Sequence, residues 1–575
     1  MAVDELNGAA TTSDAVATDV VASERANKRL MALKLTEDGR PATLFELGDA
    51  RAELTKNERI KIEKPGPKVW KDVVENYSIN GFDSIHEDDM ERFKWIGVYQ
   101  QRPKTGHFMM RIKIAGGNVP NNQIRAISKM ARQYADSIAD ITTRQTFQVH
   151  WLTIENMPAV MDVLGEAGLG VHHDLFGACG DICRNIVSSP LTGLDALEHL
   201  DPSNFFNEAN RYFSSHPDYA DLPRKFKIGV FGHRGGGQCE INCLSFYGIT
   251  RDDGRVGYGV TVGGGLSTEP HLAQDLGVWV APENGLEVME AVARIYRDHG
   301  YRKSRKHARL KYLVADWGVE KVRLKIEELL GRKMEDADAA PPSVHGYQDR
   351  YGIHAQKQDG LSFVGVPVIA GRLNSDQLDA IADIAQEFGS GEIRLTVMQS
   401  FVIPNVPDEK TGEVAARLEQ IGLPIEVSAV RGGVVACTGI QYCNLAVTET
   451  KERAKNIVQL LDEGIKWKDS EFFRINVNGC PNSCGQHWIA DVGLQGCTKK
   501  IGGELVEHYD VFLGGALGTD DGGARFNRRI KRVTAEQVAP TIHNAMAAYQ
   551  AGKNDGESFA NFCARHSEEE LEAMI

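Results

Sequence analysis

The segment FMMRIKIAGGNVPNNQIRAISKMARQYADSIADITTRQTFQVHWL, residues 108–152, decides the fold because a second version of it follows in the same chain. That version is LSFVGVPVIAGRLNSDQLDAIADIAQEFGSGEIRLTVMQSFVIPNV, residues 361–406. At an offset of about 254 residues the copies share the pairs Gln123/Gln377, Ala126/Ala380, Ile127/Ile381, Gln145/Gln399 and Phe147/Phe401. Apolar residues recur at helical spacing in 124–131 and form a short run at 147–152. Each copy is therefore predicted to form a strand, a glycine turn, an amphipathic helix and a second strand.

The repeat extends beyond these segments. The sequence YGVTVGGGLST at 258–268 is echoed by YDVFLGGALGT at 509–519. Several matches in the same order and at nearly the same offset argue against chance similarity between unrelated βα units. We expect two related halves that pack about a pseudo-two-fold axis, with a large ligand at their shared interface.

Length and composition limit the classes of function. The chain has 575 residues, enough for roughly three or four domains, and its formal net charge of −14 argues against broad nucleic-acid binding. No apolar run approaches the roughly 20 residues that span a bilayer. Residues 1–34 lack the basic start and apolar centre of a secretory signal and are richer in acids than transit peptides. They predict a mobile tail on a cytoplasmic protein.

The cysteines are the main chemical signal. The chain has ten, and four of those in the second half form two close pairs: Cys437 and Cys443 with five residues between them, and Cys480 and Cys484 with three. Four thiolates suit Zn²⁺ or an iron–sulfur cluster. Structural zinc usually takes tighter pairs, so the wide first spacing favours a cubane cluster, with reduced core cysteines as the alternative.

The motifs around these cysteines resemble a known family. ACTGIQYCNLAVTETKERA (436–454) and NGCPNSCGQHWIADVGLQG (478–496) are similar to the paired signature of the sirohaem sulfite and nitrite reductases. The resemblance runs from about Gly81 to the end of the chain and includes FMMRIKI, TTRQTFQVHW, RNIVSSPLTG, ADLPRKFK, VGGGLST and RLKYLV. It implies a mixed α+β fold in which ferredoxin-like half-domains and two larger α/β domains enclose sirohaem.

The repeat and the resemblance together divide the chain into six segments. These are a mobile tail (1–45), a wrapping segment (46–90), the first ferredoxin-like half-domain (91–155), a sirohaem- and substrate-binding domain (156–345), the second ferredoxin-like half-domain (346–410) and a cluster- and sirohaem-binding domain (411–575). The two half-domains take equivalent places in the two halves.

The resemblance also implies two cofactors. Cys437, Cys443, Cys480 and Cys484 would hold a [4Fe–4S] cluster, and Cys484 would in addition bridge the cluster to the sirohaem iron. A thiolate shared by two redox centres couples them electronically, which suits a six-electron reduction fed by single electrons.

The resemblance places basic residues around the substrate and the sirohaem. Arg111, Arg184, Lys225 and Lys227 are expected at the oxyanion, and Arg144, Gln145, Arg309, Gly264 and Gly265 at the sirohaem. If 225–227 forms a strand, its two lysines point to one face and reach one ligand. For this short segment alone, a solvated basic strand is the alternative. The charges would neutralise the anion, polarise its S–O bonds and supply protons.

The lysine pair favours sulfite over nitrite. Lys227 is an extra cation where plant-type nitrite reductases tend to have Asn, and sulfite is a dianion near neutral pH whereas nitrite is a monoanion. The expected function is assimilatory reduction of sulfite to sulfide by a monomer, with ferredoxin or a flavoprotein as a separate electron donor. The alternatives are a ferredoxin–nitrite reductase, a cobalamin-pathway oxygenase that shares the cluster signature, and a non-catalytic metal-binding protein.

Some cysteines of the first half remain outside this scheme. Tyr99 and Cys179 occupy the places of a covalent Tyr–Cys link found in some bacterial members of the family, so a thioether between them is a hypothesis. A buried tyrosine beside a small apolar cysteine is the alternative. Cys183 has no assigned role, and Cys239 and Cys243 are interpreted as reduced structural thiols.

Overall fold

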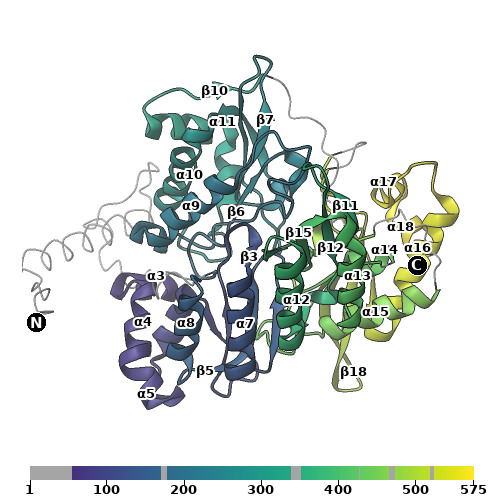
Figure 1. Cartoon of the computed structure of the whole chain (residues 1–575), viewed down its shortest axis with the longest axis horizontal. Helices are drawn as coiled ribbons and strands as arrows, with labels where there is room; N and C mark the ends of the chain where they lie inside the picture. Colours follow the sequence, from purple (N-terminus) through teal and green to yellow (C-terminus); the bar gives the residue numbers. More distant parts are fainter. Residues whose placement is uncertain (1–54, 170–177, 339–350, 427, 465–472, 519–522) are drawn as a thin grey trace, which may run out of the picture.

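The computed structural model describes residues 55–169, 178–338, 351–426, 428–464, 473–518 and 523–575. The predicted tail and residues 46–54 of the predicted wrapping segment lie outside this part of the chain. Four five-stranded sheets flanked by helices make up the described part, which gives the mixed α+β architecture that the sequence predicts (Figure 1). None of its helices combines the length and the apolar character needed to cross a membrane.

Two of the sheets form the ferredoxin-like halves, with the strand orders β1–β2–β5–β4–β13 and β11–β12–β15–β14–β3. The strands are β1 (Val98–Gln100), β2 (His107–Arg111), β3 (Asn118–Pro120), β4 (Ile138–Ile141), β5 (Phe147–Thr153), β11 (Gly352–Ala355), β12 (Leu361–Val366), β13 (Arg372–Asn374), β14 (Glu392–Leu395) and β15 (Phe401–Pro407). β3 pairs with β14, and β13 pairs with β4. Each sheet is therefore completed by a strand from the other copy of the repeat, which fixes the two halves against each other.

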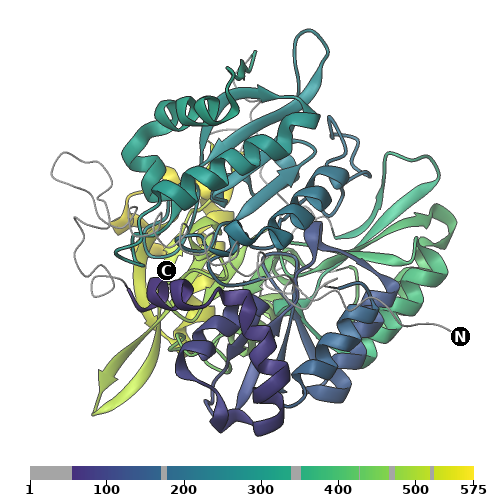
Figure 2. The same ribbon diagram turned by 90° about the vertical axis from the view of Figure 1, so that its left-hand side faces the viewer.

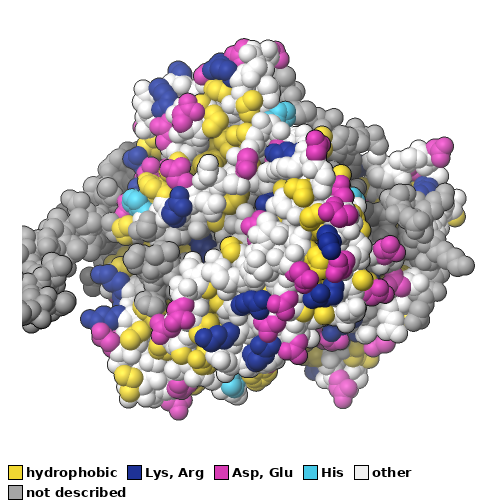
Figure 3. Space-filling view, viewed as in Figure 1, with side chains coloured by type: hydrophobic (Ala, Val, Ile, Leu, Met, Phe, Trp, Pro, Cys, Tyr) yellow, Lys and Arg dark blue, Asp and Glu magenta, His cyan; other side chains and the backbone are white. Residues whose placement is uncertain are grey.

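The two helices of the repeat, α7 (Asn121–Tyr134) and α12 (Ser375–Phe388), lie side by side (Figure 1). Their apolar faces are buried against the sheets, as the helical spacing predicts. Figure 3 shows side chains of both charges interleaved over this pair of helices. Arg125 reaches Asp383 at 2.6 Å, and Arg132 reaches Asp379 at 2.7 Å. Exposed ion pairs of this kind contribute little to stability, so apolar burial is what holds the helices.

The other two sheets form the larger domains, with the orders β10–β9–β8–β7–β6 and β16–β17–β18–β19–β20. The strands are β6 (Ile228–Phe231), β7 (Leu244–Thr250), β8 (Val256–Val262), β9 (Gln274–Val280), β10 (Glu335–Asp336), β16 (Val434–Ala436), β17 (Ile475–Asn478), β18 (Val492–Ile501), β19 (Glu504–Leu513) and β20 (Arg528–Thr534). β16 pairs in parallel with β17, whereas in the first half Val187 makes only an isolated parallel bridge to Gly229 of β6. The strand that precedes Cys437 thus has a shortened counterpart in the first half.

The remaining helices cover these sheets and the N-terminal side of the molecule (Figures 1 and 2). They are α3 (Lys56–Glu63), α4 (Val69–Asp72), α5 (Ser78–Asn80), α6 (Glu87–Arg92), α8 (Met157–Glu166), α9 (Ser203–Ser215), α10 (Gly285–His299), α11 (Leu310–Leu330), α13 (Thr411–Gln420), α14 (Ala429–Gly433), α15 (Lys451–Gly464), α16 (Val538–Gly552), α17 (Phe559–Arg565) and α18 (Glu568–Met574). Lys61 of α3 is buried; its ammonium group donates to Leu222 O at 3.0 Å and lies 3.4 Å from an Asp181 oxygen. Helix α3 therefore anchors the loops that lead to Arg184 and Lys225.

Reciprocal contacts mark the pseudo-two-fold axis. Gln238 and Gln486 are buried and exchange two amide hydrogen bonds, each of 3.0 Å. Ser128 of α7 and Ser375 of α12 each donate a hydroxyl to the other's carbonyl, at 3.0 and 3.2 Å. Contacts of this kind require both partners to occupy equivalent places, so the repeat read from the sequence is a symmetry of the structure.

Candidate active site

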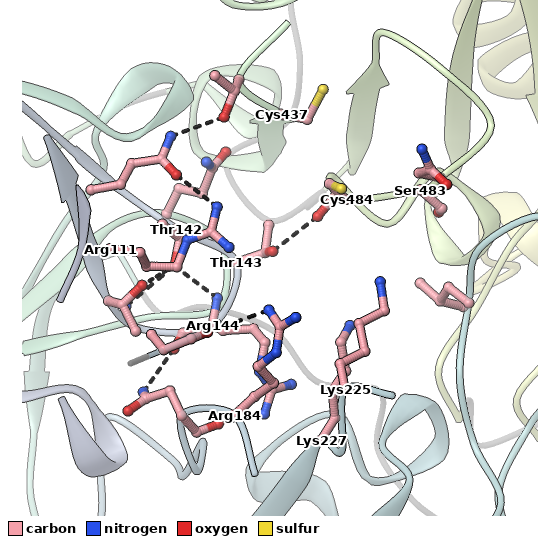
Figure 4. Close-up of a pocket in the computed structure, with 18 of the residues that line it drawn as sticks. Arg111, Thr142, Thr143, Arg144, Arg184, Lys225, Lys227, Cys437, Ser483 and Cys484 are labelled. Carbon is pink, nitrogen blue, oxygen red and sulfur yellow. Dashed lines mark hydrogen bonds between the residues drawn. The ribbon is translucent and has the colours of Figure 1, made fainter. Parts of the chain in front are cut away.

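A cavity of about 900 Å³, part of it open to solvent, lies between the two halves. Seven basic residues line it: Arg111, Arg144, Arg184, Lys225, Lys227, Arg309 and Lys451. None of the described residues that line it is acidic. Figure 4 shows the labelled arginines and lysines on one side of the cavity and Cys437 and Cys484 on the other.

The arginines are held by neutral partners rather than by carboxylates. Arg111, at the end of β2, donates to the Gln148 Oε1 at 2.9 Å and to the Cys179 Sγ at 3.2 Å. Arg144 follows β4 and donates to the Asn242 Oδ1 at 2.9 Å. The Nε atoms of Arg111, Arg144 and Arg309 are buried and have no partner among the described residues. These side chains are fixed in direction while their charge remains available to a ligand.

The ammonium groups of Lys225 and Lys227 line the cavity and have no carboxylate partner among the residues that the structure describes. Burial lowers the pKa of both ammonium groups, and the neighbouring cations lower them further; the pKa of Lys225 falls to about 7. Phe226 between them makes an isolated bridge to Cys183, so 225–227 does not form the strand that was considered from the sequence. The two lysines nevertheless both line the cavity, while Phe226 is buried in the core.

Cys437, Cys443, Cys480 and Cys484, here called the cluster cysteines, come together after β16 and β17. Burial raises the pKa of Cys437 to about 12, and the charges of Cys484 and Cys480 add to this effect. Cys480 in turn feels Cys484 and Cys443. No three His, Cys, Asp or Glu side chains in the described part of the chain are close enough to hold a single metal ion. Four thiols that interact with one another suit the four-cysteine ligation of a cubane cluster.

Three cluster cysteines also receive hydrogen bonds from N–H groups. Gly479 N donates to the Cys437 Sγ at 3.3 Å, Leu445 N to the Cys443 Sγ at 3.4 Å, and the Asn482 Nδ2 to the Cys480 Sγ at 3.5 Å. Such bonds stabilise thiolate ligands and tune the potential of a cluster. Cys437 and Cys484 line the cavity as well, so the cysteine site and the basic cavity share a wall.

Cys179 and Tyr99 meet beside Arg111. Burial raises the pKa of the Cys179 thiol, but the charges of Arg111 and Arg184 outweigh burial and leave it below its usual value. The Tyr99 hydroxyl is hydrogen-bonded to this thiol, and burial raises the pKa of the hydroxyl. Of the unassigned cysteines, Cys183, Cys239 and Cys243 are free and buried. Arg309 lies 3.5 Å from the Cys243 sulfur and keeps its pKa low.

Three residues expected at the sirohaem do not line the cavity. The Gln145 amide bonds to backbone groups only. A side chain on Gly264 would meet two backbone carbonyls, the nearer at 2.4 Å, and one on Gly265 would displace the Arg309 guanidinium at 2.8 Å. These glycines therefore serve close backbone packing and leave room for Arg309.

Several lining residues were not predicted as site residues from the sequence. Lys451, Thr143 and Gln399 are among them, and each lies inside a motif that carries the family resemblance or the repeat. Lys451 is 3.5 Å from an Asp140 oxygen, so its charge is already balanced. It differs in this respect from Lys225 and Lys227.

Two family models match the chain, and each matches it twice. The "Nitrite and sulphite reductase 4Fe-4S domain" matches residues 179–334 and 428–575. The "Nitrite/Sulfite reductase ferredoxin-like half domain" matches residues 99–167 and 354–421. The duplicated matches coincide with the two halves of the fold.

Individual proteins are similar to this one over most of the chain. "Sulfite reductase [ferredoxin] 1" of Mycolicibacterium paratuberculosis is 38% identical over 92% of this chain and 97% of its own length. "Ferredoxin--nitrite reductase" of Synechococcus elongatus is 35% identical over 81% of this chain and 91% of its own length. The solved structure of the Mycobacterium tuberculosis NirA protein matches with a TM-score of 0.85 and 36% identity, covering 91% of this chain and 98% of that one. Taken with the cluster cysteines and the basic cavity, these matches establish that the chain belongs to the nitrite and sulfite reductase family.

Proposed function

We propose that this protein reduces sulfite to sulfide by six electrons, at a sirohaem placed beside a [4Fe–4S] cluster, with reduced ferredoxin as the donor. One observation carries the proposal: a single cavity joins the basic residues of the first half to two cluster cysteines of the second. Among the seven basic lining residues, only Lys451 has a carboxylate partner in the described chain. Buried charges are costly unless paired, so the other six require anions. The carboxylates of sirohaem and an oxyanion substrate meet that requirement.

Different residues of the cavity would bind the sirohaem and the substrate. Arg144 and Arg309, which have neutral partners and unpaired Nε groups, are suited to the sirohaem carboxylates. Arg111, Arg184, Lys225 and Lys227 are suited to the smaller anion, whose S–O bonds their charges would polarise. The bound sirohaem and cluster would pass the six electrons of the donor to the substrate one at a time. Conversion of a sulfite dianion to hydrosulfide also consumes seven protons and releases three waters, and Lys225, whose pKa is about 7, can deliver protons.

Nitrite remains the second candidate substrate, because a nitrite reductase is among the relatives that cover most of the chain. The test is a steady-state assay of the purified holoenzyme with reduced ferredoxin, in which sulfide and ammonia are both measured. We expect sulfide formation, with a higher kcat/KM for sulfite than for nitrite. A higher kcat/KM for nitrite would assign the enzyme to that substrate, and the absence of both products would exclude a reductase.

The affinity for sulfite is expected to fall as the pH rises through about 7. Burial and the charge of Arg309 set the pKa of Lys225 to about 7, so this side chain loses its charge above that pH, whereas an exposed lysine stays charged to about 10. A neutral amine no longer attracts the anion, and KM should rise. Sulfite itself titrates near neutral pH, so the Lys225→Met variant is the control: it keeps the titration of the substrate and should lose the extra dependence. Identical pH profiles for both proteins would contradict the assignment.

We also propose that a thioether links Tyr99 to Cys179. The hydroxyl and the thiol are in hydrogen-bond contact, and Arg111 and Arg184 favour the thiolate. Formation of the bond removes two electrons and two protons, which an oxidant such as dioxygen would accept. Peptide mass spectrometry should find the two peptides joined, two hydrogens lighter than their sum, and should find them separate in Cys179→Ser. Separate, unmodified peptides from the unaltered protein would refute the link.

A further inference from the structure

Two glutamines at equivalent positions of the repeat hold a rarely adopted backbone conformation. Gln145 and Gln399 are buried and have positive φ, 53° and 62°. Each packs against a glycine of the preceding turn: a Cβ on Gly117 would lie 2.8 Å from that of Gln145, and one on Gly371 would lie 2.9 Å from that of Gln399. Residues other than glycine keep such a conformation only where their surroundings hold them in place. The side-chain contacts of the two glutamines provide that hold.

Gln145 joins three segments of the chain. Its amide nitrogen donates to Leu395 O at 2.7 Å and to Ser188 O at 3.0 Å, and its amide oxygen accepts from Ser188 N at 2.9 Å. Leu395 ends β14 of the second half, and Ser188 belongs to the larger domain of the first half. The side chain therefore ties its own larger domain to the other ferredoxin-like half.

Gln399 makes the same kind of connection in the opposite direction. Its amide nitrogen donates to Ile141 O at 3.0 Å, and its amide oxygen accepts from Ala436 N at 2.8 Å. Ile141 ends β4 of the first half, and Ala436 ends β16, directly before Cys437. The contacts of each glutamine are here called a latch. The two latches have the same construction but hold different segments: the Gln399 latch binds Ala436 N, next to Cys437, whereas the Gln145 latch binds Ser188.

A second contact brings the same turn to the other cysteine of the cavity. Thr143, two residues after Ile141, donates its hydroxyl to Cys484 O at 3.0 Å, as Figure 4 shows. Gln399 and Thr143 both line the cavity, whereas Gln145 does not. One turn of the first half, which also carries Arg144, therefore braces both Cys437 and Cys484.

We propose that Gln399 is a positioning residue for the cluster: together with Thr143 it fixes Cys437 and Cys484 relative to the anion-binding residues of the opposite half. The Gln145 latch joins the two halves in the same way, but it binds no residue next to a cluster cysteine. The inference rests on the proposed function only in that it requires a cluster at these cysteines. Groups that orient ligands in this way set the geometry and the potential of a metal centre.

The test compares two variants of the holoenzyme, Gln399→Met and Gln145→Met. Both substitutions keep the approximate shape of the side chain and remove its hydrogen bonds, so both should lower the melting temperature. Only Gln399→Met is expected to change the electron paramagnetic resonance spectrum and the midpoint potential of the reduced cluster, and to lower kcat by about 10-fold. Gln399→Glu keeps an acceptor for Ala436 N and should restore part of the spectrum of the unaltered protein.

Each outcome of this comparison is informative. Loss of the cluster from Gln399→Met but not from Gln145→Met would support the proposal, whereas equal changes in both variants, or an unchanged cluster spectrum in Gln399→Met, would overturn it. If Gln399→Met does not fold, Thr143→Val replaces it, since that change removes only the hydrogen bond to Cys484 O. An unaltered cluster spectrum in Thr143→Val would then contradict the proposal that these contacts position the cluster cysteines. A cluster signal absent from the unaltered protein would instead refute the proposed function.

Discussion

Cys480→Ser is expected to abolish both the iron–sulfur absorption and the reduction of sulfite. Cys480 is buried, interacts with Cys443 and Cys484, and receives a hydrogen bond from Asn482. Loss of partners that merely orient a metal ligand costs about 10- to 100-fold in activity, so loss of a ligand should cost at least about 1,000-fold. The measurements are iron and acid-labile sulfide per chain and the rate of sulfide formation.

Cys497→Ser is the matched control. Cys497 is a half-buried cysteine of β18 whose charged neighbours are Asp510, Arg529 and Arg532 rather than the cluster cysteines. This variant should keep its iron, its sulfide and its activity. Retention of a full cluster in Cys480→Ser, or equal loss from both variants, would contradict the ligand assignment.

Lys227→Asn is expected to change the substrate preference as well as the rate. Lys227 lines the cavity and has no ion-pair partner in the described chain. Removal of one cation from a preorganised anion site should lower kcat/KM for sulfite by about 100-fold. Because the Coulomb energy scales with the charge of the anion, nitrite should lose about half as much free energy, which corresponds to about 10-fold. The measurement is kcat/KM for each substrate with the same electron donor.

Lys500→Asn removes the same charge from an exposed position on β18 and should leave both values unchanged. If Lys227→Asn lowers kcat/KM by the same factor for sulfite and for nitrite, the side chain does not discriminate between the two anions by charge. An unaltered kcat/KM for sulfite would remove Lys227 from the site altogether.

Much of the fold could be predicted because each copy of the repeat shows its helix and strands in the spacing of apolar residues that are close in the sequence. The amphipathic spacing of α7 and the apolar run of β5 depend on neighbours in the sequence, and the structure confirms both. The exchange of β3 and β13 could not be predicted. Each has only three residues, and each pairs with a strand of the other copy, so no local signal distinguishes it from a turn.

In the site, too, residues that belong to a local motif could be predicted, whereas contacts between distant segments could not. Spacing and motif predict the four cysteine ligands and the basic site residues, and one cavity is lined by Cys437, Cys484 and the basic side chains. The role of Gln399 depends on Ile141 of the other half, a contact that the sequence does not express. The contact of Gly264 with sirohaem stays a prediction; the structure shows that a side chain there would meet two backbone carbonyls.

The most direct test of the central claim is the visible absorption spectrum of the purified protein, recorded before and after reduction and then during addition of sulfite. Haem bands together with iron–sulfur absorption, a change of the haem bands on binding sulfite, and stoichiometric sulfide production are the results expected if the cysteine site and the basic cavity form one redox centre. A protein that stays colourless after reconstitution with iron, sulfide and sirohaem would contradict that centre and leave the cysteines without a cluster.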